Sequence, residues 1–440
     1  MKRLTKVLTL LMIVGLLFAL VGCAAETTTP SEKTEPEKME KQETEKEKEP
    51  EKAETPTEPL QMYWFSDGVE GDVMQTILDA YEAETGVKIE LVVLPYGDYE
   101  TKLTTVLRGG EAPALARVTE GTAAVVAEHL LTLGDAYDTS KYTNVYLNSA
   151  GEAVSLPLDL TANGPFINKD LCDKYDVNYP ALGESWTWAE FETEFAKLMG
   201  KEGVAFPGVF DNKAHRFMPM VYQFGGKLWG DSYKDCKVNT EPVVEALTTL
   251  QRMNQNGTLD PAVWAGSGNP SELFRTGQYG FHMSGNWFVA GYQELGFNWC
   301  VAPMPVGNGD GATRSTILGG KGMVAFDGSG QEDAAKAFID YLSKPEVHDQ
   351  YTSGVPFLSP RLDAEVDFGD FQAAYDVFQN EISNTPVENV KDWQKQIAIT
   401  GMYPIINKAV ETACGGQDVT EVLTKLAQDL MDKAAELGLE

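Results

Sequence analysis

Polar side chains follow two predicted strands at their carboxyl ends, where they could hold a ligand. Ser66 and Asp67 come directly after a strand predicted over residues 60–65, and Glu120 follows a short strand over residues 115–118. Ligands of open parallel sheets bind beyond the carboxyl ends of the strands. This placement predicts hydrogen bonding to a polar solute, whereas helix caps or exposed loop acids are the alternative for the two carboxylates.

A second candidate is an aromatic ring that directly follows small residues, in the stretch TGQYGFHMSGNW at residues 276–287. Apolar and small residues alternate over residues 279–283, as in a short buried strand, and residues 284–286 then break the pattern. The side chain of Trp287 is therefore either part of a core below a turn or a flat surface for a ligand.

Motifs for catalysis are lacking. The sequence contains no HExxH, no GxSxG and no Walker phosphate loop, and the glycine-rich residues 307–311 lack the strand and helix of a dinucleotide site. The sequence has no CxxC motif and no Cys/His cluster, so it does not predict a metal site. We expect no catalytic residue, no metal and no cofactor, while paired carboxylates for glycoside hydrolysis stay open as an alternative.

The charge of the chain excludes one class of partner. The formal net charge is -31, with 66 Asp and Glu against 35 Lys and Arg in 440 residues. Nucleic acid is not expected as a partner, because phosphate contacts need clustered Lys and Arg. A hydrophobic content of 43% is enough for a large core. Wide spacing favours free thiols over a disulfide framework for four cysteines, Cys172, Cys236, Cys300 and Cys414.

The N-terminus has the pattern of an export signal. Basic residues precede an apolar run over residues 7–21, which is short for a membrane span and leads into Leu-Val-Gly-Cys at Cys23. This order resembles the bacterial lipobox, in which the chain is cut before the Cys and the thiol carries lipid. We expect residues 1–22 to be a signal peptide and Cys23 to hold the protein on the outer face of the bacterial cytoplasmic membrane. An ordinary cleavable signal is the alternative.

A tether follows the anchor. Residues 26–59 are nearly all Glu, Lys, Thr and Pro, so they cannot bury enough apolar surface to offset the entropy of ordering. Residues 23–59 are therefore predicted to form a disordered leash.

From residue 60 onward, strands alternate with helices, which predicts an α/β fold. A helix over residues 73–84, closed by Gly86, lies between strands over residues 60–65 and 87–94, and this order predicts a right-handed crossover in a parallel sheet. Further on, Thr187 begins a capping box with Glu190, flanked by a hydrophobic staple. Later helices are predicted between Pro242 and Gly257 and over residues 334–342 and 419–437.

Several segments, in order, resemble the extracellular sugar-binding lipoproteins of ABC importers, a family similar to maltose-binding protein. They are Phe-Ile-Asn-Lys-Asp-Leu at residues 166–171, Trp-Thr-Trp-Ala-Glu-Phe at 186–191, the stretch at 274–287, and Ala-Ala-Lys-Ala-Phe from 334. One departure is Gly-Glu-Ala-Pro-Ala-Leu at residues 110–115, where the family commonly has Gly-x-x-Pro-Asp-Val.

The resemblance implies a two-lobed periplasmic-binding-protein-like fold of type II, with the ligand cleft between the lobes. The first lobe would contain residues 60–162 plus 318–361, and the second residues 163–317 plus 362–440. The chain would cross between the lobes near residues 159–163, near 317–321 and around Arg361.

The resemblance also implies site residues. A sugar needs polar groups around its rim and aromatic rings against its C–H faces. The candidates are Trp64, Ser66, Asp67, Glu120, Asp159, Thr161, His215, Arg216, Trp229 and Trp287. For Trp64 and Trp229 a core position is the alternative, and for Arg216 a surface ion pair.

The implied function is capture of a carbohydrate, expected to be an oligosaccharide, and its delivery to the permease subunits of an ABC transporter by a monomeric binding protein. A non-sugar polar solute, such as a glycerol-phosphate or peptide-like ligand, is an alternative. A surface enzyme acting on polysaccharide is another.

Overall fold

The computed structural model describes residues 58–66, 69–148, 150–309, 311–355, 357–397 and 402–439. The predicted signal peptide, Cys23, nearly all of the tether and Asp67 lie outside these residues. The chain divides into two units, Met1–Lys52 and Ala53–Glu440, and every described element belongs to the second unit. Within the described part, no helix combines the length and the hydropathy of a membrane span.

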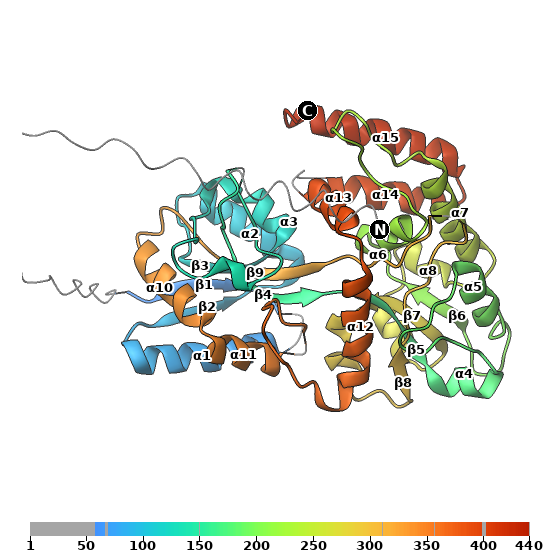
Figure 1. Cartoon of the computed structure of the whole chain (residues 1–440), viewed down its shortest axis with the longest axis horizontal. Helices are drawn as coiled ribbons and strands as arrows, with labels where there is room; N and C mark the ends of the chain where they lie inside the picture. Colours follow the sequence, from blue (N-terminus) through green and yellow to red (C-terminus); the bar gives the residue numbers. More distant parts are fainter. Residues whose placement is uncertain are drawn as a thin grey trace, which may run out of the picture. The chain divides into compact units, whose positions relative to one another are not determined.

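Among the described residues, the first sheet has five strands in the order β2-β1-β3-β9-β4 (Figure 1). Their bounds are β1 Leu60–Trp64, β2 Ile89–Val93, β3 Leu115–Thr119, β4 Leu156–Thr161 and β9 Gly319–Ala325. Strand β1 pairs in parallel with β2 and β3, which confirms the predicted parallel unit, and β9 is antiparallel to both β3 and β4. The carboxyl ends of β1, β2 and β3 therefore share one edge.

Five of the described helices belong to this sheet, namely α1 Glu70–Thr85, α2 Tyr96–Arg108, α3 Glu120–Val125, α10 Glu332–Ser343 and α11 Pro345–Gly354. The predicted end of α1 is confirmed, since Gly86 is in the left-handed conformation at φ 76° and its N–H donates to Glu82 O. The apolar side of α1 buries Met74, Ile77 and Leu78 in the core of this lobe.

The second sheet has four strands within the described ranges, in the order β6-β7-β5-β8. Their bounds are β5 Asn163–Asn168, β6 Phe206–Phe210, β7 Tyr279–Gly285 and β8 Trp299–Val301. The expected break in the pattern at Ser284 is wrong, because β7 continues through Gly285 and pairs there with Asn163 of β5. A Cβ at Gly285 would collide with the ring of Trp287, so the small residue lets that ring lie back on the strand.

The other ten α-helices of the described chain surround the second sheet. Their bounds are α4 Lys169–Tyr175, α5 Trp188–Ala196, α6 Ala214–Gln223, α7 Glu241–Gln255, α8 Pro261–Trp264, α9 Pro270–Arg275, α12 Gln372–Asn384, α13 Val387–Ile397, α14 Met402–Cys414 and α15 Val419–Glu436. The capping box at the start of α5 is confirmed, with both Thr187 and Glu190 bonding the backbone.

The chain passes from one sheet to the other at Ala162, the single residue between β4 and β5. This is the first predicted crossing. Strand β9 returns the chain to the first sheet near the second predicted crossing, at residues 317–321. At the third predicted crossing, Arg361 is fixed by ion pairs with Asp349 at 2.6 Å and Asp363 at 2.9 Å.

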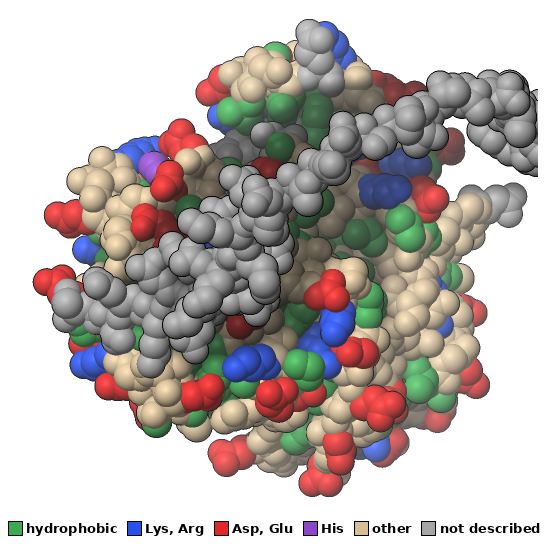
Figure 2. Space-filling model, turned by 60° about the vertical axis from the view of Figure 1, so that its left-hand side comes forward, with side chains coloured by type: hydrophobic (Ala, Val, Ile, Leu, Met, Phe, Trp, Pro, Cys, Tyr) green, Lys and Arg blue, Asp and Glu red, His purple; other side chains and the backbone are tan. Residues whose placement is uncertain are grey.

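All four described cysteines are free thiols, as expected, and Cys172 and Cys414 are buried while Cys236 and Cys300 are half-buried. The excess of acidic side chains is spread over the face shown in Figure 2, with Lys and Arg between them. Among the side chains visible on this face, the acidic ones do not gather into a single patch.

Candidate ligand-binding site

Trp287 lies where elements of both sheets meet. It is the middle residue of a short 3-10 helix, Asn286–Phe288, directly after β7 of the second sheet, yet its half-buried ring packs against the core of the first sheet. The guanidinium of Arg216 lies over its face, 4.0 Å from the ring centroid, and the ring of His215 meets it edge-on at 6.1 Å. The structure thus brings together three of the predicted site residues.

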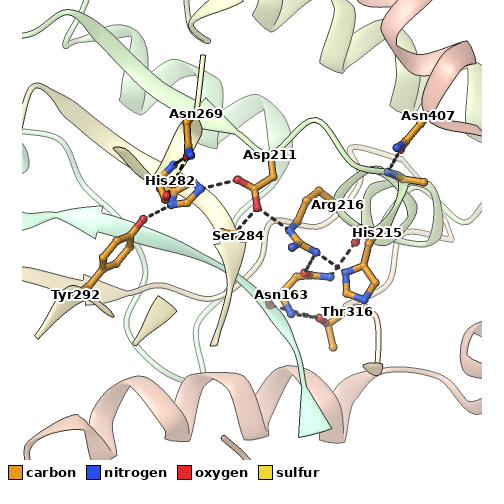
Figure 3. Close-up of polar contacts among 12 residues, drawn as sticks. Asn163, Asp211, His215, Arg216, Asn269, His282, Ser284, Tyr292, Thr316 and Asn407 are labelled. Atoms are coloured by element: carbon orange, nitrogen blue, oxygen red, sulfur yellow. Dashed lines mark hydrogen bonds and ion pairs between the residues drawn. The ribbon is translucent and has the colours of Figure 1, made fainter. Parts of the chain in front are cut away.

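Asp211 holds Arg216 in this position (Figure 3). The Nε of Arg216 donates to Asp211 Oδ2 at 3.1 Å, and its Nη1 donates to Asn163 Oδ1 at 2.9 Å. Ser284 Oγ also donates to Asp211 Oδ2 at 2.6 Å, while His282 Nε2 lies 2.7 Å from Asp211 Oδ1. Arg216 is only 8% exposed, so the predicted alternative of a surface ion pair is wrong, and the pair is an internal one.

The protonation states of this network follow from its partners. Burial opposes ionisation of Asp211, but the charge and hydrogen bond of His282, together with Arg216 and Ser284, lower its pKa to about 2. Burial, with the positive charges of Arg216 and Lys321, lowers the pKa of His215 well below its usual value. At neutral pH, Asp211 is a carboxylate and His215 is an uncharged ring.

Helix α6, which carries His215 and Arg216, is positioned by α14. Lys213 at its N-cap provides no side-chain cap. Instead, Asn407 Oδ1 accepts a hydrogen bond from the N–H of Ala214, and the hydroxyl of Tyr403 accepts one from the N–H of His215 at 3.3 Å. Two of the free amides of the helix start are thereby satisfied by another helix.

Helix α13 forms a further wall of the site. The ring of Trp393 packs edge-on against His215, with centroids 5.5 Å apart. The neighbouring Asp392 accepts hydrogen bonds from the N–H groups of Leu228 at 2.7 Å and Trp229 at 3.0 Å, which ties α13 to the segment after α6.

A cavity of about 250 Å³ adjoins Glu120. Its lining comes from α3, the segment around Tyr146 and α13, and comprises Glu120, Ala123, Ala124, Ala127, Leu130, Val145, Tyr146, Leu147, Asn148, Val154 and Gln394. Glu120 is half-buried, and desolvation raises the pKa of its carboxyl to about 7. Near neutral pH this carboxyl is present in both protonation states, so it can donate or accept a hydrogen bond.

Asp159 does not reach the cavity. It is fully buried and lies 3.3 Å from Arg117 Nη2 and 3.7 Å from Lys321 Nζ, and it also accepts the N–H of Lys321 at 3.1 Å. Glu70 lies 3.6 Å from the same Arg117 nitrogen. In this structure, the carboxylate is occupied by ion pairs inside the first lobe and is a structural element.

The two other tryptophans among the predicted site residues, Trp64 and Trp229, are core residues, which is the alternative that the sequence left open. Trp64 is 0% exposed and meets Tyr351 edge-on at 6.4 Å, and Trp229 is 1% exposed within the core of the second lobe. Ser66 is half-buried and accepts the indole N–H of Trp64 at 3.2 Å. Thr161 is buried at the end of β4, beside the crossing.

Several contributors to the site were not predicted, Asp211, Trp393 and Tyr403 among them. Asp211 follows β6 at its carboxyl end, so the same strand-end rule that selected Glu120 could have found it. Trp393 and Tyr403 join the site only through helix packing, which leaves no local signal in the sequence.

Two sheets with surrounding helices, joined at short crossings, define the two-lobed type II fold of the periplasmic binding proteins. The chain belongs to the bacterial extracellular solute-binding proteins, because the sequence model of that family matches residues 66–349. A comparison with curated proteins gave no match.

Solved structures with the same fold cover most of this chain. An ABC substrate-binding protein from Listeria monocytogenes, in complex with cycloalternan, is 22% identical, with a TM-score of 0.73 over 87% of this chain and 99% of that one. Maltose-bound MalE3 of T. maritima is 19% identical, with a TM-score of 0.69 over 84% and 98%. UgpB from Mycobacterium tuberculosis, in complex with glycerophosphocholine, is 16% identical, with a TM-score of 0.71 over 87% and 100%.

Proposed function

We propose that this protein captures a carbohydrate, an oligosaccharide in particular, and delivers it to the permease subunits of an ABC transporter. The observation that carries the proposal is the half-buried ring of Trp287 between elements of both lobes, with Arg216 over one of its faces and His215 edge-on to it. An indole ring packs against the C–H face of a sugar, and the polar groups around it exchange hydrogen bonds with hydroxyls.

The charge balance of the site favours an uncharged ligand. In and around it, Arg216 is paired with Asp211, Arg117 with Asp159 and Glu70, and Lys321 with Asp159, so three cations face three carboxylates. His215 is uncharged at neutral pH, because burial and neighbouring cations lower its pKa. An anionic solute needs an excess of positive charge that this set does not supply. The glycerophosphocholine bound by UgpB nevertheless keeps a non-sugar solute as the second candidate.

Ligand capture would proceed by closure of the two lobes. In this proposal, the first lobe is residues 60–162 plus 318–361 and the second is residues 163–317 plus 362–440. The crossing at Ala162 supports a hinge there, because one residue between two strands of different sheets must absorb the change in backbone angles.

The location of the protein is part of the proposal. Export through the signal at residues 1–22, lipid on Cys23 and the tether at 23–59 would keep a monomeric body beside its transporter. The family is extracellular, which supports export.

A thermal-shift screen tests the function. The probes are maltose, maltotetraose, cycloalternan and glycerophosphocholine, since a solute that binds only the native state raises the melting temperature. We expect at least one oligosaccharide to raise it and glycerophosphocholine to leave it unchanged. A shift with glycerophosphocholine alone would favour the second candidate, and release of smaller sugars from a labelled glycan would favour an enzyme.

A further inference from the structure

His282 is a fully buried side chain of β7 that makes a hydrogen bond at each end of its ring (Figure 3). Its Nε2 lies 2.7 Å from Asp211 Oδ1, and its Nδ1 lies 2.6 Å from the hydroxyl of Tyr292. A carboxylate only accepts hydrogen bonds, so Nε2 carries a hydrogen and donates it to Asp211. Burial raises the pKa of Tyr292, so its hydroxyl keeps its proton and can donate to a bare Nδ1. One imidazole therefore joins two separate parts of the second lobe.

The first of these bonds leads to the guanidinium at the site. Asp211 Oδ2 accepts the Nε–H of Arg216 at 3.1 Å and the hydroxyl of Ser284 at 2.6 Å. Because His282 donates to the other oxygen, both ends of the carboxylate are held, and its plane is fixed. That plane sets where the guanidinium lies, 4.0 Å from the ring centroid of Trp287.

The second bond leads to the segment that carries the indole. Tyr292 ends a short 3-10 helix, Ala290–Tyr292, that follows Trp287 closely in the sequence. The ring of Tyr292 is stacked on that of Phe288, with centroids 5.3 Å apart and an angle of 9° between the planes. Phe288 directly follows Trp287, and their ring centroids lie 6.2 Å apart. His282 thus contacts the support of the indole as well as the support of the guanidinium.

We infer that His282, held by Tyr292, is a positioning residue for the captured solute, because it fixes Asp211 and, through it, Arg216 against Trp287. The inference rests on the proposed carbohydrate function and adds to it a residue that does not touch the ligand, since His282 is 0% exposed. A solute then meets a guanidinium and an indole that are already in place, which reduces the entropy lost on binding. Histidine suits this position because its two ring nitrogens point in different directions.

Substitutions of His282 test the inference with whichever of maltose, maltotetraose and cycloalternan stabilises the wild-type protein. His282→Leu removes both hydrogen bonds, whereas the side-chain amide in His282→Gln can still donate to Asp211. Titration calorimetry measures the dissociation constants. We expect His282→Leu to weaken binding by about 10-fold or more and His282→Gln to stay within about 3-fold, because the bond to Asp211 is what positions the guanidinium.

A double-mutant cycle shows whether His282 acts through Arg216. In an Arg216→Ala background the guanidinium is absent, so we expect His282→Leu to change the dissociation constant by less than about 2-fold there. An equal loss in both backgrounds would overturn the inference. Where Arg216→Ala leaves no measurable binding, the two single variants of His282 decide.

Tyr292→Phe and Tyr279→Phe form a matched pair, because each removes one buried phenolic hydroxyl from the second lobe. Tyr292 loses its bond to His282, while Tyr279, at the opposite end of β7 from Trp287, loses its 2.8 Å bond to Asp260 Oδ2. Both should lower the melting temperature, and only Tyr292→Phe should weaken sugar binding, by about 3-fold. The pair also decides the matter if His282→Leu does not fold.

The outcomes separate the two proposals. Wild-type affinity in a folded His282→Leu or in Tyr292→Phe, with sugar binding intact in the wild type, overturns the role of His282 and leaves the carbohydrate function standing. An equal loss in His282→Gln and His282→Leu also overturns it, since the packing of the ring and not its bond to Asp211 would then carry the effect. A wild-type protein that binds none of the three sugars overturns the proposed function, and the role of His282 with it.

Discussion

At the scale of single residues, the site depends on how Trp287 and Arg216 hold each other. The guanidinium is fixed by Asp211 and Asn163 and lies on the indole, so neither side chain has to be ordered when a ligand arrives. Glu120, on the first lobe, differs from Asp211. Desolvation on burial raises the pKa of the Glu120 carboxyl, whereas the partners of Asp211 lower the pKa of that carboxyl.

Replacement of Trp287 by Ala should affect binding more than folding. The ring is half-buried at the meeting of the lobes and is not part of a closed core, so we expect a loss of affinity of about 10-fold or more for a stabilising sugar, with a smaller effect on unfolding. Titration calorimetry and urea unfolding of the same variant measure the two effects. A large drop in stability with unchanged affinity would instead make Trp287 a core residue.

The raised pKa of Glu120 predicts a pH-dependent stability difference. Its pKa is about 7 in the folded chain against 4.5 as its ordinary value, so the folded state binds the proton more tightly. The contribution of Glu120 to stability is therefore present below about pH 4.5 and is lost as the pH rises toward 7. Relative to the wild type, Glu120→Gln should become more stable over this window and then reach a plateau.

Urea unfolding of both proteins at a series of pH values measures this difference. The comparison is needed because Glu381, which burial also gives a pKa of about 7, contributes equally to both proteins. A difference between the two proteins that does not change with pH would contradict the raised pKa of Glu120.

At the scale of elements, the helices that build the site are held in two ways. Helix α5 has its own sequence-encoded start in the Thr187 capping box. Helix α6 lacks a side-chain cap at its N-cap residue and borrows Asn407 and Tyr403 from α14. The first helix start is therefore local, and the second depends on the packing of another helix.

The capping box can be tested within its own helix. Thr187→Ala removes the acceptor for the N–H of Glu190 and should lower the free energy of unfolding by about 1 kcal/mol. Thr193→Ala, inside the same helix, is the control, because Ala is the better helix former there and no cap is lost. Equal losses in the two variants in urea unfolding would show that the cap contributes nothing specific.

At the scale of the whole molecule, two sheets joined at Ala162 suit a protein that opens and closes, and the proposed tether at residues 23–59 would keep such a protein near a membrane. The scattered distribution of acidic side chains on the face in Figure 2 is compatible with a body held away from an anionic surface, since like charges repel.

Lipid attachment is the prediction at this scale. Full-length protein expressed in a bacterium should partition into the detergent phase of a Triton X-114 separation, because acyl chains on Cys23 give stable anchoring. Cys23→Ser should move it to the aqueous phase, whereas Cys236→Ser, a change within the body, should not. Detergent partitioning of Cys23→Ser at the wild-type level would rule Cys23 out as the anchor.

Local physics made much of the fold predictable. The βαβ unit over β1, α1 and β2, the left-handed Gly86 and the capping box of α5 all follow from residues a few positions apart. Hydrophobic periodicity and caps act over one or two turns, so the chain encodes them in short stretches. The strand-end rule likewise selected Glu120, which lines a cavity.

Tertiary structure decided which polar and aromatic residues form the site. Asn407 lies 193 positions from Ala214, whose N–H it caps, and no local pattern links them. Burial likewise has no local pattern. Trp64 and Trp229 have the residue type of a sugar platform but are buried in the cores, whereas Trp287 is half-buried, because exposure depends on what the rest of the chain packs around each ring. The sequence thus determined the elements and the chemistry available, and only the packing of distant elements determined where that chemistry is presented.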